Sequence, residues 1–321
     1  MCVTTRFRLG DHGRYPLGRS MKHRWLRISL RTTLVFFTSL CVCLGWYVYR
    51  VGQQQKTVKW ILENRGQIVY AGEIDTQLSG SGSPPYVPKW LFDVLGADYF
   101  SSVAEVTGLQ TDLSDVTPLA SLTSLEILNL DDTQVKDLTP LANLTKLESL
   151  SLSSTPVQNV KPLAGLTKLE GLYLDGTQVS DVSPLKELTN LEVLFLYSTP
   201  VSDAKPLAGM TELSSLSLQN TQVSDVGPLA RLTKLECLWL DPSGVNDVKP
   251  LAGLTQLRIL SLGFTQVSDV SPLTKLSNLK ELHLNNTQVS EEQVKELQQT
   301  LPKCVIRKRD LWVNGAPING G

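Results

Sequence analysis

Histidine and cysteine, the residues most often used in catalysis and metal binding, are scarce in this chain of 321 residues: it has 3 histidines and 5 cysteines. His12 and His23 lie in a basic N-terminal segment, and His283 stands alone in a leucine-rich stretch. No serine or cysteine has a basic partner at a catalytic spacing. A glycine-rich phosphate loop and a metal-spaced His/Cys cluster are also absent from the sequence. The sequence therefore predicts no enzyme active site, no cofactor and no metal site.

The cysteines do not form a disulfide pattern. Cys41 and Cys43 lie in an apolar segment, and Cys2, Cys237 and Cys304 are far apart, without a Cys-x-x-Cys pair. We expect Cys304 to be buried in a C-terminal cap and Cys237 to be an exposed strand thiol. Because no basic neighbour of Cys237 is evident in the sequence, an unreactive thiol is favoured over a reactive one.

Charge is divided unevenly along the chain. Residues 1–31 carry eight Lys/Arg against one Asp, which gives +7, whereas residues 103–300 carry 13 basic and 24 acidic residues, which gives −11. The acidic region argues against nucleic acid as a partner, because phosphate backbones are bound by basic surfaces. It would favour a basic or cationic partner.

One uncharged run, Thr32–Tyr49, is long enough to span a bilayer as a helix. Trp46, Tyr47 and Tyr49 lie at its far end, where an interfacial aromatic belt is expected. Because the basic residues precede the run, the N-terminus is predicted to be cytoplasmic and the remainder extracytoplasmic, in the periplasm or at the cell surface. The alternative is a cleaved signal peptide. No small-x-small cleavage site follows the run, which favours an uncleaved anchor.

A 22-residue repeat dominates the rest of the chain. The stretch LEILNL at Leu125–Leu130 recurs in register at Leu147, Leu169, Leu191, Leu213, Leu235, Leu257 and Leu279. A degenerate ninth copy stands in front, with Val103 and Val106 in the leucine places. A fixed period of this length is typical of a solenoid, in which each unit buries its apolar positions only against its stacked neighbours.

Each unit reads L-x-x-L-x-L-x-x-T-x-V-x-D-V-x-P-L-x-x-L-T-x with small departures. The alternating leucines predict a short strand, and the proline predicts one helical or 3-10 turn on the outer side. The turn threonine offers a hydroxyl that can bridge neighbouring turns. The repeated aspartate is expected to bond a backbone N–H at the bend, with calcium binding as the alternative. These aspartates are Asp137, Asp181, Asp203, Asp225, Asp247 and Asp269.

These residues resemble the leucine-rich repeat family in its 22-residue bacterial form, typified by internalins. The resemblance covers Val103–Thr300, with Thr or Ser where the family usually has Asn at the turn. It implies an α/β, right-handed leucine-rich repeat solenoid with a parallel β-sheet on the concave face and short 3-10 or helical turns on the convex face. The order of basic tail, anchor and repeats also resembles bacterial membrane-anchored leucine-rich repeat proteins, and this resemblance implies no catalytic residues.

The segments flanking the repeats are predicted to anchor and cap them. We divide the chain into a basic cytoplasmic tail (1–31), a transmembrane helix (32–49), a juxtamembrane helix with linker and N-terminal cap (50–102), about nine repeats with the last a cap (103–306), and a polar tail (307–321). In the first cap we expect a helix at Gln53–Asn64, a strand at Gln67–Ala71 and a second helix at Lys89–Tyr99. Trp90, Leu91 and Leu95 of that second helix are predicted to cover the first repeat.

The C-terminal cap is predicted from a break in the repeat after Val289. Ser290 followed by two glutamates is typical of a helix start. Apolar residues at 294, 297 and 301 predict the buried face of this helix, and a last strand is expected at Cys304–Ile306.

Strand alternation leaves the residue between the second and third leucine, and the two after the third, pointing away from the core. Aromatic and acidic residues occupy these positions at Tyr173, Asp175, Phe195, Tyr197, Trp239, Asp241 and Phe264. A row of exposed aromatic residues is more typical of an interface than scattered exposed apolar residues are. The alternative is that they only cover the strands. A further column, Glu126, Glu148, Glu170, Glu192 and Glu236, is interpreted as a solvated rim.

The sequence thus predicts a non-catalytic, membrane-anchored module that binds a protein partner through the concave face of its repeats. Two alternatives remain open: a structural envelope spacer or scaffold, and an enzyme for which the repeats form a substrate platform. No motif identifies the partner, because repeat proteins recognise ligands by surface detail.

Overall fold

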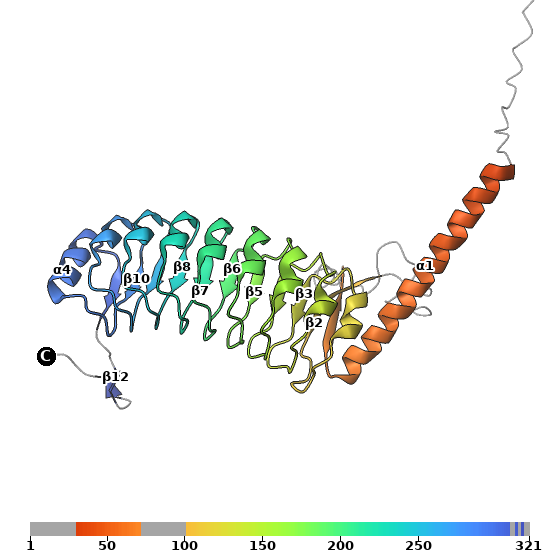
Figure 1. Ribbon diagram of the computed structural model, residues 1–321, viewed down its shortest axis with the longest axis horizontal. Coiled ribbons are helices and arrows are strands. Elements are labelled where there is room, and N and C mark those ends of the chain that lie inside the picture. The colour runs from red at the N-terminus through yellow and green to blue at the C-terminus, as the bar shows by residue number, and fades with distance from the viewer. Residues whose placement is uncertain (1–29, 72–100, 309–311, 314–315, 318–321) are drawn as a thin grey trace, which may run out of the picture. The chain divides into compact units, whose positions relative to one another are not determined.

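Figure 1 shows the computed structural model, which describes residues 30–71, 101–308, 312–313 and 316–317. The chain divides into two compact units, Met1–Tyr47 and Val48–Gly321. Helix α1 (Leu30–Glu63) begins in the first unit, and its last turns belong to the second. The repeats and the elements that cap them lie in the second unit.

The first part of α1 is the apolar segment singled out by the sequence. Leu34, Phe36 and Val42 are more than half exposed, and the other large apolar residues from Val35 to Tyr49 are also exposed. The described residues contain one helix, Leu34–Glu63, that is long and apolar enough to cross a membrane. A signal sequence near an N-terminus meets the same criterion, so the fold establishes an apolar N-terminal helix.

One sheet, with its strands in the order β1 to β11, runs through the described part of the second unit. Strand β1 (Gln67–Tyr70) is antiparallel to β2, and the later neighbours are parallel. The parallel strands are β2 (Val103–Thr107), β3 (Ile127–Asn129), β4 (Ser149–Ser151), β5 (Gly171–Tyr173), β6 (Val193–Phe195), β7 (Ser215–Ser217), β8 (Cys237–Trp239), β9 (Ile259–Ser261), β10 (Glu281–His283) and β11 (Val305–Arg307).

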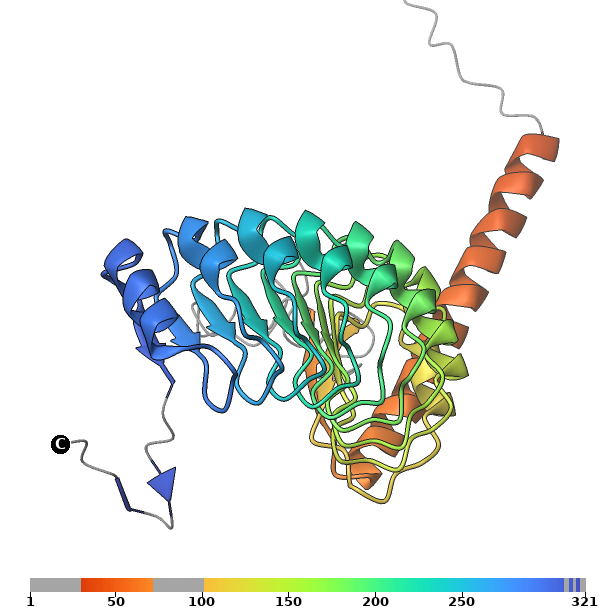
Figure 2. The same ribbon diagram turned by 60° about the vertical axis from the view of Figure 1, so that its left-hand side comes forward.

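A 3-10 turn follows each strand from β2 to β9 on the opposite side of the coil (Figures 1 and 2). The turns are η2 (Thr117–Ser121), η3 (Thr139–Leu141), η4 (Lys161–Gly165), η5 (Ser183–Glu187), η6 (Lys205–Gly209), η7 (Gly227–Arg231), η8 (Lys249–Gly253) and η9 (Ser271–Lys275). Each has the repeat proline in its first turn, as predicted.

The repeated aspartates bond the backbone where these turns begin. An Asp137 oxygen accepts from the Thr139 N–H at 2.9 Å, and Asp181 accepts from the Ser183 N–H at 2.8 Å. Hydrogen bonds from the side chains of Thr139 and Ser183, and then these backbone bonds, hold the pKa of both exposed carboxyls below the usual value. The predicted backbone role is therefore confirmed.

The core consists of leucine rows that run from repeat to repeat. Leu128, Leu150 and Leu172 pair in register on successive strands and are at most 1% exposed. The seven apolar positions of one unit are all buried, at Leu125, Leu128, Leu130, Val135, Leu138, Leu141 and Leu144. The leucines of one repeat are covered only by those of the repeats before and after it. The first and last repeats therefore need caps.

The turn threonines act within their own repeat, so the predicted bridge between neighbouring turns is wrong. The Thr133 hydroxyl donates to the Leu130 carbonyl at 2.6 Å, and Thr155 and Thr177 make the equivalent bond. The chain turns after the third leucine, which brings its carbonyl within hydrogen-bond distance of the hydroxyl three residues later. Each bond satisfies a buried polar pair.

The N-terminal cap is built from the end of α1 together with β1. Val58 and Ile61 of α1 are buried against the first repeat, and the Thr57 hydroxyl donates to the Pro118 carbonyl at 3.1 Å. Gly66 ends the cap helix, and a Cβ there would lie 2.5 Å from Ile61 Cγ2. The helix and strand expected here are present. The cap helix predicted at Lys89–Tyr99, with Trp90, Leu91 and Leu95, lies outside the described residues.

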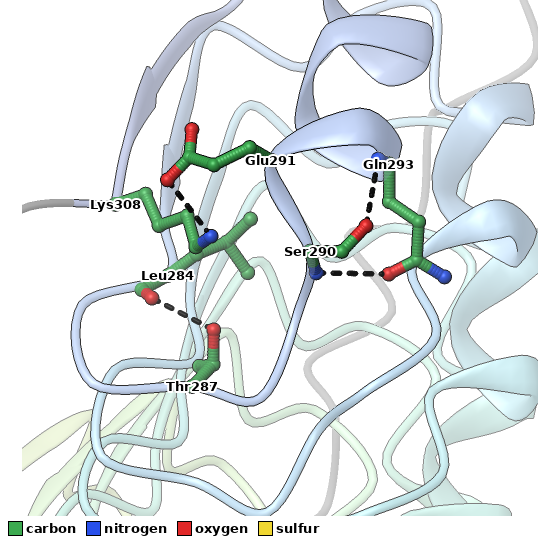
Figure 3. Close-up of polar contacts among 6 residues, drawn as sticks. All are labelled: Leu284, Thr287, Ser290, Glu291, Gln293 and Lys308. Atoms are coloured by element: carbon green, nitrogen blue, oxygen red, sulfur yellow. Dashed lines mark hydrogen bonds and ion pairs between the residues drawn. The ribbon is translucent and has the colours of Figure 1, made fainter.

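The C-terminal cap consists of α4 (Glu291–Thr300) and β11. Ser290 caps α4 in a capping box, in which its hydroxyl accepts from the Gln293 N–H and the Gln293 side chain accepts from the Ser290 N–H (Figure 3). Leu297, Leu301 and Cys304 are buried, as expected, whereas Val294 of the predicted face is only half-buried against the core. Strand β11 begins at Val305, one residue later than predicted. In the tail, β12 (Trp312–Val313) pairs with β13 (Ala316–Pro317).

Candidate binding surface on the parallel sheet

We use "sheet face" for the surface formed by the outward residues of β2–β10 and the two residues after the third leucine of each repeat. At its centre, Tyr173, Phe195 and Trp239 form an aromatic row on β5, β6 and β8. The rings of Tyr173 and Phe195 lie 5.4 Å apart at 88°, and those of Phe195 and Trp239 lie 5.9 Å apart at 83°. Such edge-to-face pairs contribute about 0.5–1.5 kcal/mol each beyond burial.

Small neighbours make this row possible. Tyr173 and Phe195 are paired across adjacent strands, whereas Phe195 and Trp239 are separated by Ser217 on β7. The rings meet above Ser217 because its side chain is short. On β5, a Cβ at Gly171 would lie 3.3 Å from Tyr173 Cε2, so the Tyr173 ring lies back over the glycine. All three rings remain half-exposed.

Acidic side chains line the edge of the sheet face beyond the rings. One Asp175 oxygen accepts from the Tyr197 N–H at 2.7 Å, and Asp241 accepts from the Gln219 side chain at 3.0 Å. Burial raises the pKa of Asp175, opposed by the Tyr197 N–H and reinforced by the charge of Asp131. Asp175 therefore lacks a compensating positive charge.

Tyr197 and Phe264 are the two most exposed aromatic side chains of the repeats, at 49% and 53%. Phe264 has φ = 56°, in the left-handed region where a bulky residue is strained. Its N–H donates to the Asn285 carbonyl at 2.7 Å, which holds the turn in this conformation. Among the described residues, no ring contact joins Tyr197 or Phe264 to the aromatic row. The predicted residues thus share one face; three of the rings are in contact, and Asp175 bonds the backbone of Tyr197.

Two polar residues of the sheet face were not singled out by the sequence. Ser217 is 4% exposed, and its hydroxyl has no hydrogen-bond partner in the described structure. Ser261 is 1% exposed and lies 3.4 Å from His283 Nδ1. His283, which stands alone in the sequence, is half-buried and lies 3.5 Å from a Glu281 oxygen. Sequence alone does not reveal these because their burial depends on the side chains of adjacent strands.

The structure gives little support for nucleophilic or metal chemistry. Cys237 is half-buried between Ser215 and Ile259 of the flanking strands, so the prediction of an exposed thiol is wrong. Burial, with the charge of Glu236, raises the pKa of this thiol and so reduces its thiolate fraction. Across the described residues, no group of three or more His, Cys, Asp or Glu is placed to hold a metal ion.

The glutamate rim lies along the other edge of the strands. A hollow of ≈ 300 Å³ there is lined by Glu148, Lys168, Glu170, Asn190, Glu192 and Glu212. Lys234 pairs with Glu212, and Arg258 pairs with Glu236 at 3.0 Å. These exposed pairs offset part of the repulsion along the rim, and each contributes little to stability.

Comparison with known proteins identifies the family. The sequence profile described as Leucine Rich repeats (2 copies) matches residues 145–187 and 255–298. The crystal structure of internalin C2 from Listeria monocytogenes is 44% identical, with a TM-score of 0.54, and the match covers 55% of this chain and 78% of that one. The chain belongs to the internalin-like leucine-rich repeat proteins. Comparison with curated proteins gives no match.

Other structures are similar to this internalin-like chain at lower identity. Internalin F from Listeria monocytogenes is 28% identical over 65% of this chain and 81% of its own, with a TM-score of 0.48. The ectodomain of the plant receptor kinase GASSHO1/SCHENGEN3 from Arabidopsis thaliana, in complex with CASPARIAN STRIP INTEGRITY FACTOR 2, is 19% identical over 74% of this chain and 34% of its own, with a TM-score of 0.55. The plant receptor shows the shared fold alone.

Proposed function

We propose that this chain is a non-catalytic, membrane-anchored module that holds a protein partner on its sheet face. The contact residues are Tyr173, Asp175, Phe195, Tyr197, Trp239, Asp241 and Phe264. The observation that carries the proposal is the aromatic row, because three mutually supporting, half-exposed rings at the centre of a sheet are typical of interface anchors. Rings of this size expose apolar surface to water unless a partner covers them.

Two further observations support a binding role. Internalin-like repeats are generally protein-interaction modules, and the plant receptor of the same fold is in complex with a factor in its structure. The groups that could have served an enzyme, Cys237 and His283, are half-buried on separate strands. We therefore favour a binding module over an enzyme.

Site-specific photo-crosslinking tests the proposal. A benzophenone amino acid is placed at Tyr197 or Phe264 on the sheet face and, as a control, at Lys186, which is exposed on the 3-10 side in η5. We expect covalent adducts with the same partner in intact cells from the first two positions and none from Lys186. Replacing the aromatic row with Tyr173→Ser, Phe195→Ser and Trp239→Ser should abolish these adducts. Adducts that persist in this variant would refute the sheet face as the site.

The anchoring and topology are also proposals. Thr32–Tyr49 would span the membrane, with the N-terminus in the cytoplasm and the repeats outside it. An uncleaved anchor is supported by the continuity of α1, because Val51, just beyond the apolar segment, is already buried. Cleavage just after the apolar segment would remove the first residues of α1 that belong to the second unit.

A compartment-sensitive reporter fused after Gly321 tests this topology. We expect activity only outside the cytoplasm and retention of the chain in the membrane fraction. Replacing the Lys and Arg of residues 1–31 with Gln should reduce correct insertion, because these residues set the orientation. A cytoplasmic signal from the wild-type fusion would overturn the localisation, and a soluble secreted product would show a cleaved signal.

A further inference from the structure

The sheet face carries carboxylates without any lysine or arginine. Across the outward positions of β2–β10 and the two positions after each third leucine, the acidic residues are Glu105, Asp131, Asp132, Asp175, Asp241 and Glu281, and the one imidazole is His283. The donors that bond Asp131, Asp175 and Asp241 are hydroxyl, amide and backbone N–H groups, which are neutral. Glu281 lies 4.0 Å from Arg307 of the neighbouring β11, so the negative charge that this face presents without a cation is that of Asp131, Asp175 and Asp241.

An aspartate stands beside each end of the aromatic row. Asp175 follows Tyr173 by two residues and Asp241 follows Trp239 by two. Both aspartates lie just beyond the end of their strand, and two residues of chain span at most about 7 Å. A cation above either terminal ring thus has a carboxylate within reach. Rings attract cations through their faces, and the carboxylates add to this attraction.

The burial of Asp175 shows which charge this face lacks. The carboxyl is half-buried, and its pKa is raised mainly by the loss of hydration, with the charge of Asp131 acting in the same direction. A positive charge nearby would reverse this effect. The sheet face does not supply one, so a partner would have to.

Ser217 offers an independent sign that a polar group belongs at this place. Its hydroxyl lies under the contact between Phe195 and Trp239, is buried, and has no hydrogen-bond partner in the described structure. Buried hydroxyls in native proteins are normally bonded. Binding that moves Phe195 and Trp239 apart would let an ammonium or guanidinium group of the partner donate to this hydroxyl.

We propose that the partner segment held on the sheet face is basic: an extended protein segment whose lysine or arginine side chains lie over the aromatic row and pair with Asp175 and Asp241. This inference rests on the proposed function and adds the chemistry of the partner. An uncharged apolar segment would remove water from both carboxylates without replacing it, and an acidic segment would be repelled. A basic segment satisfies the rings and the carboxylates together.

Selection of short random peptides tests this chemistry. The full chain is held in nanodiscs of zwitterionic lipid, so that basic peptides do not bind the bilayer, and a displayed peptide library is selected on it. We expect the selected peptides to be enriched in lysine and arginine relative to the input library. Binding of the best peptide should weaken roughly tenfold in the Asp175→Asn, Asp241→Asn double variant, and should fall as salt rises.

Two variants separate failure of this inference from failure of the proposed function. The ring variant removes the aromatic row and carries Tyr173→Ser, Phe195→Ser and Trp239→Ser. The control variant, Glu187→Gln, removes an exposed charge on the 3-10 side. Uncharged peptides that need the rings but ignore the double Asp→Asn change would overturn the basic partner and leave the binding face standing. Peptides that bind the ring variant as well as wild type would overturn the binding face itself. A selection without lysine or arginine enrichment also contradicts the inference. Unfolding midpoints verify that each variant is folded.

Discussion

At the residue scale, three residues of the sheet face have features that reduce the stability of the fold. Ser217 buries an unpartnered hydroxyl, Phe264 places a bulky side chain at positive φ, and Asp175 buries a carboxylate without a cation. Each of these features is unfavourable by itself. Their occurrence on one face is typical of surfaces where binding limits stability.

Phe264→Gly is expected to raise the free energy of unfolding by up to about 1 kcal/mol, because glycine adopts positive φ without the clash of a Cβ. Urea unfolding of the detergent-solubilised chain measures the change. Asn220→Gly is the matched control, since Asn220 has φ = 53° and asparagine tolerates this region, so its effect should be smaller. If Phe264 contacts the partner, the same substitution should weaken binding.

Asp175→Asn is expected to stabilise the fold at neutral pH and to have little effect in acid. The pKa of Asp175 is raised in the folded chain above its ordinary value of 3.8, so ionisation is less favourable there than in the unfolded chain. Stability is therefore lost as pH rises through the pKa, and asparagine removes this loss while still accepting from the Tyr197 N–H.

Unfolding curves recorded from acid to neutral pH test the sign of this effect. Asp181→Asn is the control of opposite sign, because the pKa of Asp181 is lowered by its bonds to Ser183. Stability from Asp181 is present above its unfolded pKa and lost as pH falls, so that variant should be less stable at neutral pH. Equal behaviour of both variants would contradict the assigned pKa directions.

At the element scale, each end of the solenoid is covered by one helix and one strand. At the N-terminus α1 and β1 cover the first repeat, and at the C-terminus α4 and β11 cover the last. The caps depend on local chemistry that the repeats lack. Gly66 allows the close approach of Ile61 at one end, and the capping box of Ser290 starts the helix at the other.

Ser290→Ala should lower the free energy of unfolding by about 0.5–2 kcal/mol, because the Gln293 N–H loses its acceptor at the start of α4. The exposed Ser180→Ala change is the control and should be close to neutral. Hydrogen exchange of α4 and β11 should accelerate in the first variant only. Unchanged exchange there would show that the box does not hold the cap.

At the scale of the whole molecule, the second unit is a stack in which each repeat contacts only its neighbours. Leucines at equivalent positions pair from β3 to β10 and remain buried throughout. Stability is then a sum of terms for repeats and for the contacts between them. A defect in the core should act locally first and spread along the stack.

Leu150→Ala is expected to cost about 2–5 kcal/mol, since the cavity it leaves is closed on both sides by Leu128 and Leu172. Hydrogen exchange should increase most in the repeats around β4 and less toward α4. Leu62→Ala, at a side chain 58% exposed, is the control and should change little. A uniform increase along the whole solenoid would contradict the nearest-neighbour description.

Most of the fold could be predicted because each local signal in a repeat has a single structural consequence. The leucine period predicts the buried rows, the proline predicts the 3-10 turns, and Ser290 predicts the start of α4. The errors concern side-chain partners and burial. The hydroxyl of Thr133 bonds the Leu130 carbonyl of its own repeat, and Cys237 is half-buried between Ser215 and Ile259 of the neighbouring strands. The period gives the positions of these neighbours, but it does not decide which group a hydroxyl bonds or how much of a thiol is covered.

The sequence by itself determined the solenoid, the strand register and the set of outward positions, because a strict period imposes the same contacts on every coil. Only the tertiary structure decided which outward residues meet. Phe195 contacts Trp239 across Ser217, and Asp175 is partly stripped of water beside Tyr197, because ring orientation and burial depend on the side chains of two or three adjacent strands at once.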